Sequence, residues 1–232
     1  MLTNAEISNK GRALIRICPS ILNADRANLG SEILRVSNES DLIHLDVMDN
    51  IFVPNLTFSL EDSRRIIGET PIPVDAHLMI NNPDQDAALY AKAGAKSVTF
   101  HLEASAHPEA TSQLIRSEGA RVGIAIKPKT AFSSLAPLLE FVDMALIMTV
   151  EPGFGGQSFM EDMMPKVREA RAEIDRKHFG KIWLQVDGGI SLETIDVATS
   201  AGADTFVAGS AVFKAENPGD MVNLLRSKAS KQ

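Results

Sequence analysis

The residues best suited to chemistry alternate with aliphatic ones in residues 42–49, LIHLDVMD. Side chains alternate across a β-strand, so His44, Asp46 and Met48 share one face of a predicted strand and the aliphatic residues share the other. An imidazole and a carboxylate are costly to bury without partners. Two metal-compatible ligands two residues apart on one strand face therefore indicate half of a metal site. The alternative is an edge strand whose polar face is solvated.

Similar polar side chains lie near the ends of two later strand-like segments. His77 lies late in residues 74–80, and Asp187 closes residues 182–187. Functional residues of a (β/α)8 barrel gather at the carboxyl ends of its parallel strands, where these side chains would meet. The predicted metal ligands are His44, Asp46, His77 and Asp187. Such nitrogen and oxygen ligands leave zinc, iron, manganese and cobalt open, and His101 is a weaker candidate from a further strand-like segment.

Other residues at predicted strand ends suggest the walls of a site. Ser20 directly follows the first predicted strand, and Met48, Met79 and Met148 each lie late in a strand. Thioether side chains are apolar and polarizable, so they could wall a site and keep water from a reactive intermediate. Filling the core is an equally simple explanation for the three methionines.

Three glycine-rich turns follow predicted strands, at residues 153–156, 188–189 and 209–210. Glycine lets the backbone approach an anion closely, and N–H groups at helix N-termini can bind phosphate. The loops after the seventh and eighth strands form the usual phosphate site of a (β/α)8 barrel. Helix–strand folds need glycine at turns in any case, but three such turns at one end predict a phosphorylated small molecule held beside a metal ion.

Predicted strands and helices alternate along the whole chain. The strands are expected at residues 15–17, 42–49, 74–80, 97–102, 122–126, 144–150, 182–187 and 204–208. The helices are expected at residues 24–36, 60–68, 83–94, 108–118, 132–139, 160–176, 191–202 and 219–228. Strict alternation predicts an α/β protein with a parallel sheet, closed or doubly wound. Eight units favour the closed (β/α)8 TIM barrel, with residues 1–14 as a polar leader and residues 15–232 as a single catalytic domain.

The composition excludes several classes of protein. The net charge of −7 argues against a nucleic-acid binder, which needs a basic surface. The single cysteine, Cys18, excludes intrachain disulfides and fits a reducing compartment. No apolar run reaches membrane-spanning length, and the first residues lack the apolar core of a signal peptide. We therefore expect a cytoplasmic protein that acts on a small molecule without nucleic acid or membrane.

Several segments, in order and spacing, resemble the ribulose-phosphate 3-epimerase family. The similarity runs from Ile17 to Phe213. It rests on the segments CPSILNAD, LIHLDVMDNIFVPNLTF, VDAHLMI, MTVEPGFGGQSF, VDGGI and GADTFVAGSAVF. Within these segments none of the four predicted ligands or the phosphate-site glycines is altered.

The resemblance implies an isomerase with a TIM barrel of the ribulose-phosphate-binding type. Such an enzyme uses one divalent metal ion per subunit to interconvert D-ribulose 5-phosphate and D-xylulose 5-phosphate in the pentose phosphate pathway. Asp46 and Asp187 would be its two acid/base catalysts, working through an enediolate by two-base proton transfer, and the family commonly forms homo-oligomers. The implied substrate contacts are Ser20, His77, Gly153, Phe154, Gly155, Gly156, Asp187, Gly188, Gly189, Gly209 and Ser210.

The sequence departs from the family pattern at a few positions. Asn50 and Ile51 stand where the family usually has glycine and a basic or polar residue, while Asn23 and Gln185 replace a more usual serine and glutamate. One alternative is a 3-epimerase for a six-carbon ketose phosphate such as D-allulose 6-phosphate. Another is a non-catalytic sugar-phosphate sensor, which the intact acid/base pair disfavours.

Overall fold

The structure is a computed structural model that describes residues 14–177 and 181–231. The predicted leader therefore lies outside the described residues, apart from Leu14. Within those ranges the chain forms eight strands, each parallel to its neighbours in one sheet. They are β1 (Arg16–Pro19), β2 (Ile43–Met48), β3 (Val74–Met79), β4 (Ser97–His101), β5 (Arg121–Ile126), β6 (Met144–Met148), β7 (Trp183–Asp187) and β8 (Thr205–Ala208).

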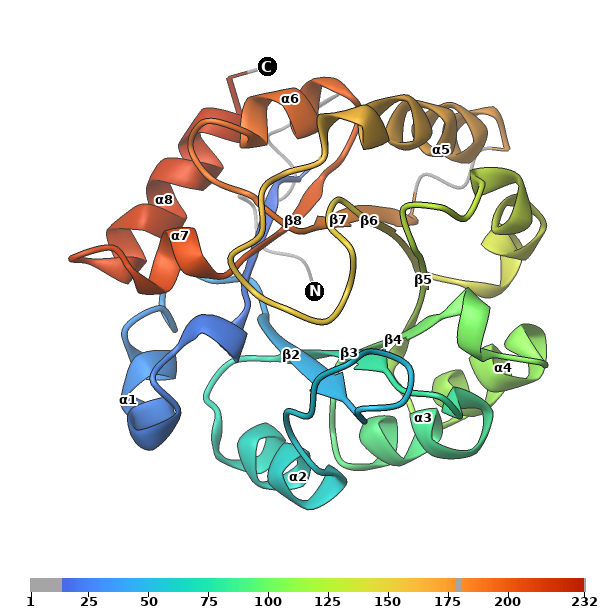
Figure 1. The fold of residues 1–232 in the computed structure, drawn as a ribbon, viewed down its shortest axis with the longest axis horizontal. Coiled ribbons are helices and arrows are strands. Elements are labelled where there is room, and N and C mark those ends of the chain that lie inside the picture. Colours follow the sequence, from blue (N-terminus) through green and yellow to red (C-terminus); the bar gives the residue numbers. More distant parts are fainter. Residues whose placement is uncertain (1–13, 178–180, 232) are drawn as a thin grey trace, which may run out of the picture.

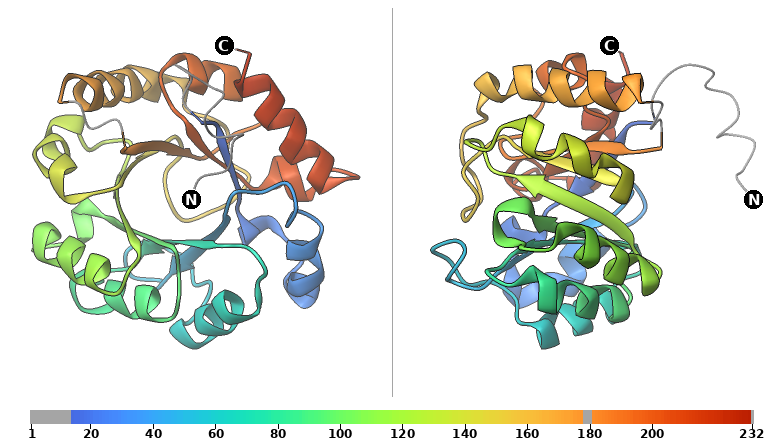
Figure 2. Two further views of the ribbon diagram at one scale, coloured as in Figure 1. Left: turned by 180° about the vertical axis from the view of Figure 1, so that it is seen from behind. Right: turned by 90° about the vertical axis from the view of Figure 1, so that its right-hand side faces the viewer.

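The sheet curls into an almost closed barrel. Its order is β1-β8-β7-β6-β5-β4-β3-β2, and a single parallel bridge between Ser20 and His44 joins the end of β1 to β2. Figure 1 shows the strands as a central ring with the helices outside it, and the two views of Figure 2 show the same outer layer from behind and from the side. The predicted (β/α)8 barrel is confirmed.

Helices connect the strands around the outside of the barrel. They are α1 (Leu29–Leu34), α2 (Leu60–Glu69), α3 (Pro83–Lys92), α4 (Pro108–Ser117), α5 (Met164–Arg176), α6 (Ile195–Ser200), α7 (Ser210–Phe213) and α8 (Pro218–Ala229). Within the described ranges no helix has both the length and the apolar character that crossing a bilayer requires.

The helices expected at residues 160–176 and 191–202 are shortened to α5 and α6. Two other predicted helices were wrong in extent for identifiable local reasons. The helix expected at residues 132–139 is instead two 3₁₀ helices, Phe132–Ser134 and Ala136–Phe141. Pro137 cannot donate the hydrogen bond that a continuous α-helix would need from that position. The helix expected at residues 24–36 is shortened to α1, because Asp25 accepts a hydrogen bond from the Ala27 N–H at 3.0 Å and starts a separate 3₁₀ turn.

The strand β2 shows how the barrel turns an alternating sequence into a site. All six of its residues are buried, which excludes the solvated edge strand. Ile43, Leu45 and Val47 belong to the main hydrophobic cluster, which includes residues of the surrounding helices. His44 and Asp46 lie on the opposite, inner face, so the polar side chains point into the barrel.

Candidate active site and metal centre

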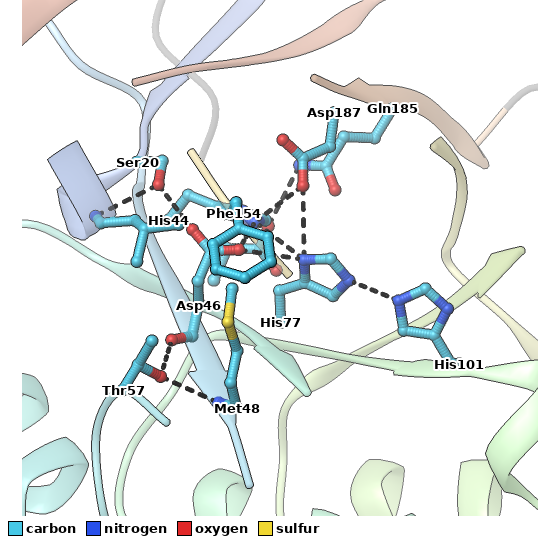
Figure 3. Close-up of polar contacts among 12 residues, drawn as sticks. Ser20, His44, Asp46, Met48, Thr57, His77, His101, Phe154, Gln185 and Asp187 are labelled. Atoms are coloured by element: carbon cyan, nitrogen blue, oxygen red, sulfur yellow. Dashed lines mark hydrogen bonds and ion pairs between the residues drawn. The ribbon is translucent and has the colours of Figure 1, made fainter. Parts of the chain in front are cut away.

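The four predicted ligands meet at the carboxyl ends of β2, β3 and β7. One nitrogen or oxygen of each of His44, Asp46, His77 and Asp187 lies within 4.8 Å of the others (Figure 3). The register of the sheet produces this, because Asp46 lies directly opposite His77 on the neighbouring strand. Across residues 14–177 and 181–231 no second cluster of three or more such side chains forms.

His44 presents its Nε2 atom to the centre of the cluster. Nε2 lies 3.4 Å from Asp46 Oδ1 and 3.7 Å from Asp187 Oδ2. The other ring nitrogen, Nδ1, lies 2.9 Å from Asp75 Oδ2, which also accepts a hydrogen bond from Gln185 Nε2 at 3.0 Å. His44 therefore presents one ring nitrogen to the cluster, where it lies 3.2 Å from His77 Nδ1, and has the other engaged behind it.

His77 presents the opposite ring nitrogen. Its Nδ1 lies 3.3 Å from Asp46 Oδ1 and 3.4 Å from Asp187 Oδ2. Its Nε2 lies 3.0 Å from Nε2 of His101, the weaker candidate from sequence. His101 is thus outside the ligand cluster and contacts it only through His77.

The buried charges of the cluster are mutually dependent. Burial disfavours a charged imidazole, yet the Asp46 and Asp75 carboxylates raise the pKa of His44 well above its ordinary value. Burial likewise opposes ionisation of Asp46, but His44 and His77 hold its pKa well below the usual range. The carboxylates favour positive charge at this point, and a bound metal cation can supply that charge in place of a proton on the imidazole.

The donor set fits a divalent cation. Two imidazole nitrogens and two carboxylate groups converge on one point, and the remaining imidazole nitrogens already have hydrogen-bond partners. Zinc, iron, manganese and cobalt all accept such mixed ligands. These four residues are therefore able to hold the predicted metal ion.

A cavity opens above this cluster at the mouth of the barrel. Of the predicted site residues, those that line it are Ser20, Asp46, Met48, Met79, Met148, Gly153, Phe154, Gly155, Gly156, Asp187, Gly188, Gly189, Gly209 and Ser210. His77 is fully buried beneath the cavity and does not line it. Ser20 Oγ donates a hydrogen bond of 2.5 Å to Asp46 Oδ2, which fixes that carboxylate at the cavity floor.

The three glycine turns all reach this cavity. In Figure 1 the loop between β6 and α5 crosses the mouth of the barrel, and it carries Phe154, which Figure 3 places over the cluster. Gly188 has a φ of +124°, and a Cβ there would lie 2.8 Å from the Val150 backbone nitrogen. Only glycine allows this packing of the loop after β7 against the loop after β6.

The loop after β2 differs from the glycine-containing turn that is usual in the family that the sequence resembles. Asn50 takes the left-handed conformation with a φ of +61°, which asparagine tolerates better than most residues. Asp49 Oδ1 accepts a hydrogen bond from the Ile51 N–H at 2.8 Å, and the Ile51 side chain is exposed. Asn55 Nδ2 donates to the Gly153 carbonyl at 2.8 Å, so the loop still contacts the glycine turn after β6.

Sequence reasoning assigned no role to several residues around the site. Asn23 and Gln185 were noted only as departures, yet Asn23 lies between the Gly155 and Gly209 backbones and lines the cavity. Asp75, behind His44, was missed. Its position two residues before His77 on the same strand face was the available signal.

Comparisons with known proteins agree with this geometry. Residues 16–213 match the model of the ribulose-phosphate 3 epimerase family. The chain is 47% identical to a ribulose-phosphate 3-epimerase of Mycobacterium tuberculosis, over 92% of each chain. It is 43% identical to the cytoplasmic isoform of ribulose-phosphate 3-epimerase from Oryza sativa, over 92% of this chain and 94% of that protein.

Solved structures with low sequence identity share the fold. The 3-hexulose-6-phosphate synthase of Salmonella typhimurium matches with a TM-score of 0.67 at 19% identity, over 94% of this chain and 99% of that one. The 3-keto-L-gulonate-6-phosphate decarboxylase of Vibrio cholerae matches with a TM-score of 0.67 at 15% identity, over 95% and 99%. These likenesses concern the barrel alone.

Proposed function

The chain belongs to the ribulose-phosphate 3-epimerase family, and we propose that it inverts C3 of D-ribulose 5-phosphate and D-xylulose 5-phosphate with Asp46 and Asp187 as the two acid/base groups. The observation that carries the assignment is the convergence of these carboxylates. They come from β2 and β7, line one cavity, and each places an oxygen within 4.8 Å of the same imidazole nitrogens.

Inversion at C3 needs a proton removed from one face of the carbon and returned to the other. Asp46 is held by Ser20 and both histidines, so it has a fixed orientation at the cavity floor. Asp187 has fewer contacts, and its side chain is 15% exposed. One carboxylate removes the proton beside the carbonyl, giving an enediolate, and the other protonates the opposite face.

His44, Asp46, His77 and Asp187 would hold a divalent metal ion. When bound, that ion supplies Lewis-acid stabilisation of the negative charge that develops on the substrate oxygens. The methionines Met48, Met79 and Met148 line the same cavity and limit the access of water to the reacting carbon. Elemental analysis of the purified protein decides among zinc, iron, manganese and cobalt.

The glycine turns are proposed to bind the substrate phosphate. The turns at residues 153–156, 188–189 and 209–210 line the same cavity. Backbone N–H groups in such turns can donate hydrogen bonds to phosphate oxygens without a charged side chain. The substrate would then span the cavity, with its phosphate at the turns and C3 between the carboxylates.

Two further properties are proposed from the family. We expect a homo-oligomer, to be measured by light scattering, and a cytoplasmic location. The name of the rice relative supports that location.

A coupled assay for D-xylulose 5-phosphate formation tests the proposed function. We expect turnover of D-ribulose 5-phosphate that is lost after prolonged chelation and restored by a divalent metal ion. D-Ribulose without phosphate should react very poorly, and D-allulose 6-phosphate less well than the five-carbon substrate. Higher kcat/KM for D-allulose 6-phosphate would establish the six-carbon alternative, and full activity of demonstrably metal-free protein would contradict the metal assignment.

A further inference from the structure

The two histidines of the metal cluster use different ring nitrogens, and each must carry its proton on the other nitrogen to bind a metal. His44 faces the cluster with Nε2, so its proton belongs on Nδ1. His77 faces the cluster with Nδ1, so its proton belongs on Nε2. The surroundings of the outer nitrogens therefore decide whether each lone pair is available.

For His44 the outer partner is a carboxylate. Asp75 Oδ2 lies 2.9 Å from Nδ1, and a carboxylate only accepts hydrogen bonds. Gln185 donates to the same oxygen, so it helps to hold Asp75 in place. The proton of His44 is thereby kept on Nδ1 by a direct contact.

For His77 the outer partner is another histidine, which could donate or accept. His77 Nε2 lies 3.0 Å from His101 Nε2, and His101 Nδ1 lies 3.3 Å from Glu103 Oε2. Both imidazoles are fully buried, while the Glu103 side chain is 22% exposed at the edge of the barrel. Figure 3 shows His101 beyond His77, on the side away from the cluster.

The carboxylate at the outer end gives this row of hydrogen bonds one direction. Glu103 can only accept, so His101 carries its proton on Nδ1 and its Nε2 must accept from His77. Glu103 Oε1 accepts from the Lys127 N–H at 2.7 Å and from the Thr130 hydroxyl, so both carboxylate oxygens are engaged. For a neutral His101, reversing either bond in the row would place two donors or two acceptors against each other.

We propose that His101 and Glu103 are positioning residues that hold His77 in the tautomer and ring orientation required to bind the metal ion. Neither residue touches the substrate cavity or the four donor atoms. The inference rests on the proposed metal-dependent function, and it adds two residues from β4 and the turn after it. Replacing a residue that hydrogen-bonds to the outer nitrogen of a metal-binding histidine commonly weakens metal affinity by about 10- to 100-fold.

The test compares zinc affinity in the full-length protein, by competition with a chromophoric chelator. His101→Phe keeps the ring but removes the nitrogen that accepts from His77. Glu103→Gln keeps the shape but places an N–H group against either His101 or the Lys127 N–H. We expect both variants to bind zinc about 10- to 100-fold more weakly than the parent protein. His107→Phe and Glu109→Gln make the same substitutions at exposed positions next to and within α4, and should leave the affinity unchanged.

A second readout separates positioning from general stability. In ¹⁵N spectra of the zinc-loaded parent protein, the His77 Nε2–H signal should be present. In both variants that signal should be lost or should exchange rapidly with water. Wild-type zinc affinity together with an unchanged His77 signal in Glu103→Gln would overturn the proposal, even if His101→Phe fails to fold. Loss of activity with unchanged zinc affinity would likewise refute it. If instead zinc binds normally to Asp46→Asn as well, the metal assignment itself has failed.

Discussion

Asp187→Asn is the most informative substitution, because the structure predicts that it separates proton transfer from metal binding. Asp46 remains 3.4 Å from His44 Nε2 and 3.3 Å from His77 Nδ1, so three of the four donors stay in place. Asparagine keeps the shape of the side chain but cannot act as a base. We therefore expect the metal ion to bind more weakly without being lost.

The expected loss in kcat follows from the missing acid/base group. One such group contributes about 10²- to 10⁴-fold to rate, which corresponds to about 2.7 to 5.4 kcal/mol of transition-state stabilisation. Inversion needs both carboxylates in each cycle, so the double variant with Asp46→Asn should lose little more than either single variant. The coupled assay is run with metal content confirmed for each protein.

Deuterium exchange provides the sharper measurement. In D₂O, Asp187→Asn should still exchange the C3 proton of the epimer whose proton faces Asp46, without inverting that carbon. The other epimer should show no exchange. Asp46→Asn is the contrasting variant. It should lose more metal, because Asp46 lies closer to both histidines than Asp187 does and is also held by the Ser20 hydroxyl. Inversion by metal-loaded Asp187→Asn at a near wild-type rate would refute the two-base mechanism.

Two further predictions follow from packing and burial. In Gly209→Val the added side chain would collide with the Asn23 carboxamide. We therefore expect KM for D-ribulose 5-phosphate to rise at least tenfold, with a smaller change in kcat. An unchanged KM would show that this turn does not bind phosphate. Burial, with His77 nearby, lowers the pKa of His101 to about 4 from 6.5, so between these pH values only the unfolded chain binds a proton there. The contribution of His101 to the unfolding free energy of metal-free protein should therefore fall by about 3 kcal/mol as the pH falls across this window. His101→Phe should remove that part of the slope in urea titrations, and an identical slope in both proteins would contradict the assignment.

Much of the fold could be predicted because it depends on local patterns. The alternation of apolar strands with helices indicated eight units, and the described part of the chain forms a barrel of eight strands. Errors arose where a local feature was overlooked, as at Pro137, which divides an expected helix into two 3₁₀ turns. Such boundaries follow from single hydrogen bonds that a periodic pattern does not reveal.

The candidate metal site was predictable because each ligand sits at a recognisable place on its own strand. A period of two put His44 and Asp46 on one face, and strand ends located His77 and Asp187. The distances among them were not predictable, because they depend on how the strands pair and how the barrel closes. Asp46 meets His77 only because β2 and β3 pair in that register.

By itself, the sequence determined which residue types lie at the strand ends and which faces they share. Tertiary structure alone decided what lies behind them. Gln185 reaches Asp75 across 110 residues of sequence, and His101 reaches His77 from the next strand. Strand periodicity predicts the face of the strand on which a side chain lies. It does not predict which side chain lies opposite, because sheet register and barrel closure decide that. The orientation of both candidate histidine ligands is therefore a property of the closed barrel rather than of any one segment.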